Sequence, residues 1–479
     1  MSSNRPVLLW FRQDLRLSDN PALSVAVATG QPVIPVYIHD TEGHGDWPPG
    51  GAAQWWLHHS LSALAASLEA RGSQLILRSG RARDVLCGLI AETGASKIFW
   101  NRCYEPAAIA RDRALKAELP AFGCAVESHS GNLLREPWEP KTQSGAAFKV
   151  FSPFFRALSS LGPAGAPLPA PEGLNTGSQL LASERLADWA LTPSRPNWAR
   201  GFEAVWTPGE AGAQRRLQDF LDRRVATYAQ DRDRPDGETT SRLSPHLHFG
   251  EITPSQIWHA TTTREAGRGH QKFLSEVGWR EFSYHLLYHQ PQLPHDNLRP
   301  EFERFPWRED AAAFQAWSKG QTGVPIVDAG MRELWTTGWM HNRVRMIVAS
   351  FLVKNLGIHW REGKAWFWDT LVDADLANNA ASWQWVAGCG ADAAPYFRVF
   401  NPVLQGLKFD PDGLYVRRWV PELSKMPSAH IHAPWSAGAS ILADAGVKLG
   451  LTYPAPIVDL SESRARALAA FAQLKTQVA

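Results

Sequence analysis

The stretch from Asp373 to Trp385, DADLANNAASWQW, combines side chains that are costly to bury: two acids, two adjacent asparagines and two tryptophans. On a helix, Asn379 and Trp383 lie four residues apart and share a face, while Trp385 points to a nearly opposite side. Tryptophans at this spacing usually belong to a core. Buried carboxylates and amides nevertheless need partners, and a large polar ligand would supply them. We therefore expect Trp383 and Trp385 to face two different compartments.

Two other segments pair polar and bulky side chains in the same way. FLSEVGWREF places Glu276 and Trp279 three residues apart. WMHNRVRM places Asn342 and Met346 four residues apart. Each pair shares one helical face, so each predicts a wall that combines a hydrogen-bonding group with a large apolar group. Core packing is the simpler interpretation of any one pair taken alone.

The segment from Thr240 to Ser244, TSRLS, could bind an anion. Small hydroxyls flank Arg242, and Ser244 before Pro245 predicts a helix N-cap followed by proline at the first helical position. Hydroxyls and free amides at a helix start bind phosphate, and arginine adds a fork of donors. A capped helix without a ligand is the more common meaning of this pattern on its own.

Metal, disulfide and membrane chemistry are not indicated. The four cysteines are dispersed and form no CxxC pair, which is typical of reduced thiols in the cytosol. His246 and His248 lack further nearby ligands and are more often structural than metal-binding. No apolar segment follows a basic N-terminus, and no apolar run is long enough to cross a bilayer. We expect a cytoplasmic protein of bacterial type, without membrane association.

The elements that position these residues fall into two types. PVLLWF, PVIPVYI, SQLILR and KIFW predict buried strands within about the first 130 residues. Between the second and third, one helical face carries Leu57, Leu61, Leu64 and Leu68, and Gly72 suits the helix end. Strands alternating with helices predict a doubly wound parallel sheet. The region has no GxGxxG, so the usual dinucleotide fingerprint is absent.

The pattern changes after a segment rich in Pro, Gly and Ala at residues 162–179. We expect an α/β domain over 1–132, an interdomain linker over 133–200 and a larger all-α domain over 201–479. RRLQDFLDRRVATYAQ, residues 215–230, predicts one amphipathic helix of the last part. The net charge is only +2, so a nucleic-acid surface would have to be a local patch.

Six segments, in order along the chain, resemble blocks of the DNA photolyase/cryptochrome flavoproteins: WFRQDLRLSDNPAL, TSRLS, WREF, GWMHNRVRM, DADLANNAASWQW and DAAPYFRVFNPVLQG. The resemblance extends over essentially the full length. It implies a folded, U-shaped FAD in the all-α domain, with Asn379 beside flavin N5. The residues that match flavin-contacting positions are Tyr228, Thr240, Ser241, Arg242, Leu243, Ser244, Arg280, Asn342, Asp373, Asp375 and Asn379.

The resemblance also implies an electron relay through Trp383, Trp360 and Trp307. Indole is among the most easily oxidised side chains, so a line of indoles can carry an electron from the surface to the flavin in short hops. Trp366 and Trp368 flank the same region. Core packing is the more common role for both, and a branch of the relay is the alternative.

Local features separate repair enzymes from light receptors within the family. Asn379 stands where plant cryptochromes resemble one another in having Asp, and an amide favours a stable reduced flavin. Asn342 and Met346 stand where (6-4) photolyases have two histidines for acid chemistry. Trp279 and Trp385 resemble the aromatic pair that cradles damaged bases, whereas plant cryptochromes typically have Tyr at the latter position. These features imply a cyclobutane pyrimidine dimer photolyase.

The implied substrate is ultraviolet-damaged DNA, single- or double-stranded, bound by a monomer. Glu276 and Asn342 would hydrogen-bond the pyrimidine edges, with Glu276 buried and protonated, and Met346 would complete an apolar wall. Arg232 and Gln405 match DNA-contacting positions. Blue light would excite reduced FAD, which would give an electron to the flipped-out dimer; the ring would open and the electron would return.

Arg343 and Arg345 are further candidates for DNA contact. Arg343 could equally pair with an acid near the flavin, and Arg345 could be a solvated surface arginine. Both therefore remain open between a phosphate contact and a structural role.

The subclass and the light-harvesting antenna follow from weaker signals. HLHFGEITPSQIW, MRELWTTGWMHN and FWDTLVDADL look closer to class III photolyases and plant cryptochromes than to class I enzymes, and Trp335 belongs to this signature. Glu105 is present, but the three residues after it differ from the polar contacts of folate-binding class I members. Methenyltetrahydrofolate is the antenna that class III similarity implies, a deazaflavin is the second choice, and an empty site is the third.

Two other functions remain as alternatives. General similarity to plant cryptochromes and Trp335 favour a cryptochrome-type blue-light receptor. A flavin-binding redox protein unrelated to DNA is the third alternative, and the pocket match and the tryptophan relay count against it.

Overall fold

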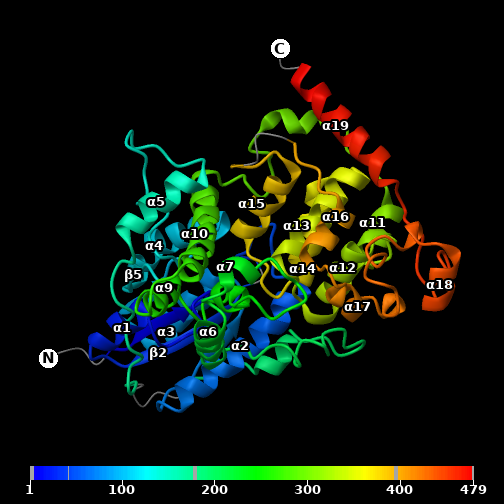
Figure 1. Cartoon of the computed structure of the whole chain (residues 1–479). Helices are drawn as coiled ribbons and strands as arrows, with labels where there is room; N and C mark the ends of the chain where they lie inside the picture. The colour runs from blue at the N-terminus through cyan, green and yellow to red at the C-terminus, as the bar shows by residue number, and fades with distance from the viewer. Residues whose placement is uncertain (1–4, 41, 176–180, 393–396, 477–479) are drawn as a thin grey trace.

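A parallel sheet followed by a helical region makes up the chain, as a computed structural model shows (Figure 1). The structure describes residues 5–40, 42–175, 181–392 and 397–476. The sheet order is β3-β2-β1-β4-β5, and all neighbouring strands are parallel. The strands are β1 (Val7–Phe11), β2 (Val33–His39), β3 (Ile76–Ser79), β4 (Lys97–Asn101) and β5 (Ala125–His129).

The predicted doubly wound sheet is confirmed, with one strand more than the sequence indicated. β5 was missed because its sequence, AVESH, has no apolar run and because it lies at the sheet edge, partly exposed. The predicted leucine face of α2 is buried, and Gly72 (φ 76°) follows the helix end. The helices of this part are α1 (Pro21–Ala28), α2 (Gly51–Glu69), α3 (Ala82–Thr93) and α4 (Pro106–Glu118).

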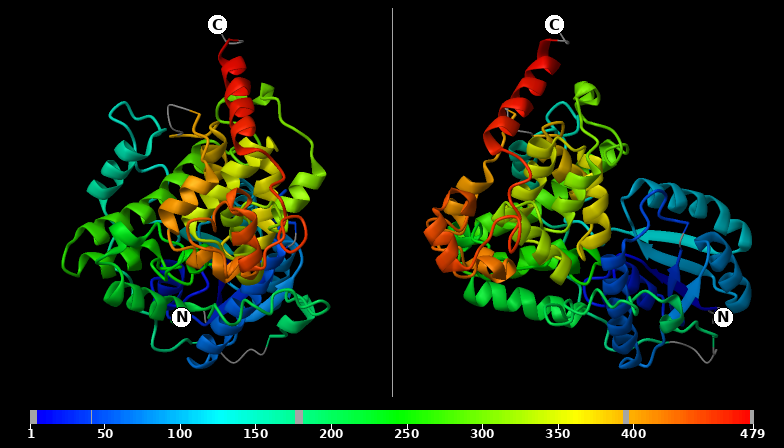
Figure 2. Two further views of the ribbon diagram at one scale, coloured as in Figure 1. Left: turned by 45° about the vertical axis from the view of Figure 1, so that its right-hand side comes forward. Right: turned by 90° about the vertical axis from the view of Figure 1, so that its right-hand side faces the viewer.

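The rest of the chain is mainly helical and lies beside the sheet. The last helix, α19, projects from this helical part (Figure 2). Its helices that wall the site or support it are α5 (Phe151–Leu161), α6 (Glu210–Arg223), α7 (Tyr228–Asp231), α8 (Ser244–His248), α9 (Pro254–Thr262), α10 (Arg268–His289), α13 (Asn342–Ser350), α14 (Trp360–Thr370) and α15 (Leu376–Ala387). The others are α11 (Ala311–Ser318), α12 (Pro325–Thr337), a π-helix (Phe351–Leu356), α16 (Pro402–Phe409), α17 (Leu414–Trp419), α18 (Ala439–Ala445) and α19 (Leu460–Thr476).

The helix expected over residues 215–230 is two helices, so this prediction is wrong at its centre. α6 ends at Arg223 and α7 begins at Tyr228. The first turn of α10 packs against the break: a Cβ on Gly269 would lie 1.8 Å from the Val225 carbonyl oxygen. Tertiary packing thus overrides the amphipathic pattern, which continued through the break.

The segment expected as a linker carries structure of its own. α5 lies within it and packs against α10, burying Phe151, Phe154 and Leu158. Residues 162–175, rich in Pro and Gly, form neither helix nor strand, and 176–180 lie outside the described residues. Across the described part of the chain, no helix is both long and apolar enough to cross a membrane.

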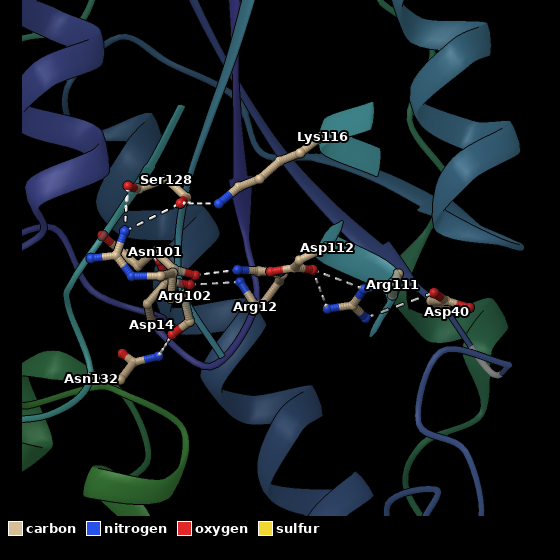
Figure 3. Close-up of polar contacts among 10 residues, drawn as sticks. All are labelled: Arg12, Asp14, Asp40, Asn101, Arg102, Arg111, Asp112, Lys116, Ser128 and Asn132. Atoms are coloured by element: carbon tan, nitrogen blue, oxygen red, sulfur yellow. Dashed lines mark hydrogen bonds and ion pairs between the residues drawn. The ribbon is translucent and has the colours of Figure 1, made fainter. Parts of the chain in front are cut away.

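A buried polar network around Arg12 ties the carboxyl end of β1 to α4 and to β4, since Arg12 also donates to the carbonyl oxygen of Asn101, the last residue of β4 (Figure 3). The Arg12 guanidinium donates to both carboxylate oxygens of Asp112 on α4, each at 2.8 Å, and lies 4.6 Å from the centre of the Trp10 ring. Arg111 lies 3.2 Å from the same carboxylate and 3.9 Å from that of Asp40. Burial opposes the Arg12 charge, but Asp112, Cys103 and Asp14 together outweigh it and raise the pKa of Arg12.

Replacing Asp112 with Ala should destabilise this part of the chain by about 3 kcal/mol, because it leaves the buried Arg12 charge without its partner. The measurement is urea unfolding followed by tryptophan fluorescence, since Trp10 and Trp100 adjoin the pair. Glu118→Ala, on the same helix, removes only an exposed pair with Arg83 and serves as the control. Equal midpoints for the two variants would contradict the assigned role.

Candidate functional site

A cavity of about 780 Å³ lies among the helices of the second part of the chain. Its size is in the range of a cofactor site. Most residues singled out from the sequence line it: Tyr228, Arg232, Thr240, Ser241, Arg242, Leu243, Ser244, Glu276, Trp279, Arg280, Asn342, Met346, Asp373, Asp375, Asn379, Trp383 and Trp385. Trp307, Trp360 and Gln405 do not line it.

The expectation of two compartments around α15 is wrong. Trp383 and Trp385 line the same cavity, which follows α15 from Asn378 to Val386. Trp383 is buried, and Trp385 is half-buried, with its indole N–H donating to the Asp392 carbonyl oxygen at 3.1 Å. Side chains that point in different directions from α15 therefore reach one cavity, and helical spacing alone does not show this.

Asp375 joins three helices at the floor of the cavity. One carboxylate oxygen caps α15 by accepting from the Asn378 amide at 2.9 Å and from its side chain at 2.7 Å. The other accepts from the Tyr284 hydroxyl on α10 and lies 3.5 Å from the His248 imidazole on α8. Burial alone would raise the pKa of Asp375, but His248, Arg280 and Tyr284 lower it overall. The site therefore holds a buried, charged carboxylate.

Asp373 has one satisfied oxygen and one that is not. Its Oδ2 accepts from the Ser244 hydroxyl at 2.6 Å and from Arg345 at 2.8 Å. Its Oδ1 is buried and finds no donor within the described chain. Since a buried carboxylate oxygen without a donor is costly, it indicates a ligand with an N–H or O–H group at this wall. Arg345 thus lines the cavity and pairs with Asp373, and it is not the solvated surface arginine considered as one alternative.

Ser244 does not cap α8 as the sequence predicted. It is the first residue of the helix, Leu243 stands at the cap position, and the Ser244 hydroxyl is used by Asp373 instead. A strong charged acceptor across the cavity outcompetes the local backbone amide. The prediction failed because local sequence cannot show where residue 373 lies.

The loop before α8 presents unused backbone donors. Within the described chain, the amides of residues 240–243 have no acceptor. Arg242 adopts φ 50°, a left-handed conformation that is uncommon outside glycine and occurs at functional sites. Its guanidinium lies 4.7 Å from the centre of the Trp339 ring, at the cavity wall. Free amides, hydroxyls and a guanidinium make this loop a phosphate-type anion site.

Asn379 is fixed in one orientation. Its Nδ2 donates to the backbone carbonyl oxygen of Lys364 on α14 at 3.1 Å, so Oδ1 is the atom left to accept a hydrogen bond in the cavity. α14 approaches closely because position 363 is glycine: a Cβ there would lie 2.1 Å from the Trp383 ring. Gly363 therefore allows Trp383 and Asn379 to sit together at one wall.

Trp279 is held rigidly at the opposite wall. Its ring stacks on Phe151 of α5, with 3.7 Å between ring centroids and 8° between planes. One face is thereby occupied, and the side chain remains half-buried at the cavity. Asn342 and Met346 also line the cavity, so the predicted shared face is confirmed. Trp279, Trp385, Met346 and Asn342 together form an amphipathic part of the lining, which we call the cavity mouth. It combines two flat aromatic rings, a thioether and an amide.

Glu276 is less buried than the sequence suggested. A quarter of its side chain is exposed, and it forms ion pairs with Arg232 and, at 2.9 Å, with Lys272. Arg232 lies at the cavity wall, nearly buried, and is not a free surface group. Arg343 pairs with Asp233 at 2.7 Å, the structural alternative considered for it.

The remaining tryptophans and Gln405 lie outside the cavity. Trp360 is fully buried and donates to the Asn297 side chain at 2.9 Å. Trp307 is half-buried and reaches Trp360 through His359, with ring separations of 4.7 and 5.6 Å. Gln405 lies on α16, partly exposed. Trp307 and Trp360 are thus joined through His359, and Trp383 lies at the cavity wall.

Some cavity residues were missed from the sequence. Trp339, His248 and Asn378 line the cavity. Trp339 is the second residue of the GWMHNRVRM segment, and Asn378 is half of the asparagine pair, so both lie within recognised signals. His248 was assigned a structural role, and only the fold shows that it approaches Asp375.

The lining fits a flavin dinucleotide on several independent grounds. The unused amides of the 240–243 loop suit a pyrophosphate. The Asp373 Oδ1 without a donor and the free acceptor of Asn379 suit N–H groups of an isoalloxazine ring. The Nε atoms of Arg232 and Arg343 are also buried without partners. Such a set of unpaired polar atoms is explained by a large polar cofactor.

Asp373→Asn should weaken retention of this cofactor by about tenfold or more, because it removes the charge that holds Arg345 and Ser244. The measurement is the ratio of flavin to protein absorbance after gel filtration. Asp222→Asn, which removes the partner of Arg264 away from the cavity, is the matched control and should retain the cofactor. Retention by both variants at the wild-type level would exclude the role of Asp373.

Comparison with known proteins agrees with this geometry. A family model described as DNA photolyase matches residues 7–172, and one described as FAD binding domain of DNA photolyase matches residues 273–473. A deoxyribodipyrimidine photo-lyase of Agrobacterium fabrum is 54% identical over 98% of each chain. Cryptochrome-1 of Arabidopsis thaliana is 41% identical over 98% of this chain and 70% of its own. The crystal structure of a class III photolyase from Agrobacterium tumefaciens superposes with a TM-score of 0.95 at 53% identity, covering 98% of each chain.

Proposed function

The chain belongs to the DNA photolyase/cryptochrome family, and from this membership we infer that it is a deoxyribodipyrimidine photo-lyase, which splits cyclobutane pyrimidine dimers in DNA under blue light. The observation that carries this function is the cavity mouth. It places Trp279, Trp385 and Met346 around a space that also reaches Asn379. A flat, apolar lesion and a flavin can therefore share one cavity.

We propose that FAD is held by the residues that the resemblance identified. The 240–244 loop binds its phosphates, Asp373 and Asn379 accept from its ring N–H groups, and Arg280 with Asp375 completes the polar floor. Bound FAD in its reduced form supplies the electron that opens the cyclobutane ring after excitation and takes it back afterwards. The amide of Asn379 keeps a neutral acceptor beside the ring, which favours the reduced form.

The mouth residues extract and hold the lesion. Flipping a damaged pair out of a duplex costs a few kcal/mol. Stacking on Trp279 and Trp385 offsets this cost by ~1–3 kcal/mol per base. Trp279 is already immobilised by Phe151, so little side-chain entropy is lost when a base stacks on it. Met346 fills the remaining apolar wall.

The polar residues of the mouth read the pyrimidine edges. The Glu276 carboxylate, paired with two cations, is an acceptor and suits the ring N–H of a pyrimidine. The Asn342 amide donates to a ring carbonyl oxygen or accepts as needed. Gln405, partly exposed on α16, provides a phosphate-side contact, and the nearly buried Arg232 holds the Glu276 carboxylate in place.

We propose that Trp383, Trp360 and Trp307 carry electrons from the surface to the cofactor. Trp383 and Trp360 are both buried, at 2% and 0% exposed, and Trp307 is half-buried. This relay reduces the cofactor before repair begins and takes no part in the repair cycle. Trp366, stacked on the exposed Trp335 at 6.2 Å, is the alternative branch.

Further properties are proposals of the same kind. A class III antenna, methenyltetrahydrofolate before a deazaflavin, would bind the α/β domain of residues 1–132, joined to the catalytic domain of 201–479. A cytoplasmic monomer acting on single- or double-stranded DNA fits the absence of any membrane-spanning helix in the described residues. A cryptochrome-type receptor is less supported, because Asn379, Asn342 and Met346 retain the repair-type pocket.

The decisive experiment is light-dependent repair. Purified protein, photoreduced with a thiol, should restore the thymine absorbance of oligothymidine containing cyclobutane dimers under blue light and leave it unchanged in the dark. No recovery from protein with a normal reduced flavin spectrum would reject repair and favour the receptor.

Trp385→Ala should weaken selective binding of the damaged strand about tenfold or more, because it removes one stacking surface. The measurement is the ratio of dissociation constants for irradiated and undamaged oligothymidine. Trp335→Ala removes an exposed tryptophan away from the cavity and should leave the ratio unchanged. An unaltered preference in Trp385→Ala would refute its stacking role.

A further inference from the structure

Lys364 of α14 places a buried ammonium between two indole rings. Its Nζ lies 3.8 Å from the ring centre of Trp47 and 5.2 Å from that of Trp360. Only 1% of the residue is exposed, and Nζ donates to the Pro294 carbonyl oxygen. Within the described chain, no carboxylate forms an ion pair with it. A buried cation held mainly by aromatic faces is unusual, because its charge is only weakly compensated.

The charges that face this ammonium come from two sides. On its own helix, Arg361 lies 5.4 Å from the Trp360 ring and is paired with Glu303 at 3.2 Å. Burial, with repulsion from Arg361, lowers the pKa of Lys364 to about 7. Arg361 therefore has a counter-charge, whereas Lys364 is the uncompensated cation beside the Trp360 ring.

Neutral or paired groups complete the surroundings. Burial lowers the pKa of His359, which contacts Trp360, to about 4, so that ring is uncharged at neutral pH. On the Trp47 side, His295 lies 3.7 Å from Asp46 and 5.7 Å, ring to ring, from Trp47. Lys364 is thus a buried cation close to the Trp360 ring whose pKa lies near 7.

Trp360 occupies the middle of the proposed relay, so its readiness to give up an electron decides the yield. Removing an electron leaves a positive charge on the indole. A cation at about 5 Å raises the free energy of that state, and in a buried setting the effect is only partly screened. Trp47, from the loop before α2, holds the ammonium from its other side.

We propose that Lys364 is an electrostatic gate on Trp360: its ammonium opposes electron release from Trp360, and its neutral amine permits it. This inference rests on the proposed relay. Each relay tryptophan gives one electron inward and regains one from its outer neighbour, and a thiol reductant in solution supplies the last electron at Trp307. Lys364 exchanges only a proton with solvent. Cofactor reduction should therefore become faster as pH rises through the range in which Lys364 loses its charge.

The test is flash spectroscopy on oxidised holoenzyme with thiol present, recording the yield of long-lived tryptophan radical and the rate of flavin reduction. At pH 6, Lys364→Met should raise the radical yield at least about threefold over wild type, the scale expected for one partly screened charge. Between pH 6 and pH 8, the radical yield of the wild type should rise towards that of Lys364→Met. The radical yield of Lys364→Met itself should stay constant over this range. Lys364→Arg keeps the charge, so its radical yield should remain low at both pH values.

Lys354→Met is the matched control. Lys354 is also buried, also donates to a backbone carbonyl oxygen, and has a pKa lowered by burial to about 7. Its ring contact is with Phe397, at 3.9 Å, and not with a relay tryptophan. The control should keep the wild-type pH profile. If Lys364→Met does not fold, Lys364→Gln provides a second neutral side chain.

A measurement without flavin checks the charge change itself. The lowered pKa means that wild type binds fewer protons folded than unfolded above pH 7, so its unfolding free energy should rise from pH 7 towards 10. Lys364→Met should lack this share of the rise. A profile identical to wild type would overturn the proposal.

The outcomes separate this proposal from the repair function. Equal radical yields in wild type, Lys364→Met and Lys364→Arg, with normal flavin content, would overturn the gate. Wild-type photoreduction in Trp360→Phe would overturn it too, since the electron would then take another route. Chemically reduced Lys364→Met should repair dimers at the wild-type rate, and failure of repair in all proteins would reject only the proposed function.

Discussion

One buried carboxylate, that of Asp375, fixes the geometry on which the site depends. It caps α15, accepts from Tyr284 on α10 and approaches His248 on α8, so three helices distant in sequence meet at one charge. A charge in this position is tolerable only because it is surrounded by donors and by the Arg280 guanidinium. Without Asp375, the end of α8 and the start of α15 would lose their common partner, and Asn379, on the first turns of α15, would lose its fixed position at the cavity.

The polar lining of the cavity in the helical part is explained only by a bound ligand that supplies the missing hydrogen-bond partners. Ion pairs such as Arg345 with Asp373 satisfy some atoms, while Asp373 Oδ1 and the 240–243 amides stay unsatisfied. A fold that keeps such groups trades stability for a prepared binding surface. The aromatic residues around it are fixed by packing: Trp279 by Phe151, and Trp383 by the space that Gly363 leaves.

Local patterns predicted the elements well and the long-range partners poorly. The four strands and the leucine face of α2 follow from apolar periodicity, whereas the polar edge strand β5 gave no such signal. Helical spacing identified Glu276, Trp279 and a few similar cavity residues, whereas others, such as Tyr228 and Arg280, came from the family resemblance. The predictions of Ser244 as a cap and of a buried Glu276 were wrong. Asp373 and Arg232 lie on other elements, and Lys272, four residues earlier on the same helix, pairs with Glu276. Spacing gives the face of a helix but not what it meets.

The Phe151–Trp279 stack has a consequence for how such a chain can be rebuilt. Phe151 belongs to the stretch that joins the two parts, yet its ring forms the back of a wall at the cavity mouth. The joining stretch is therefore not an interchangeable tether. A chimera that takes its sheet from one relative and its helices from another should therefore be joined before α5. A junction after α5 would separate Trp279 from the Phe151 that supports its ring.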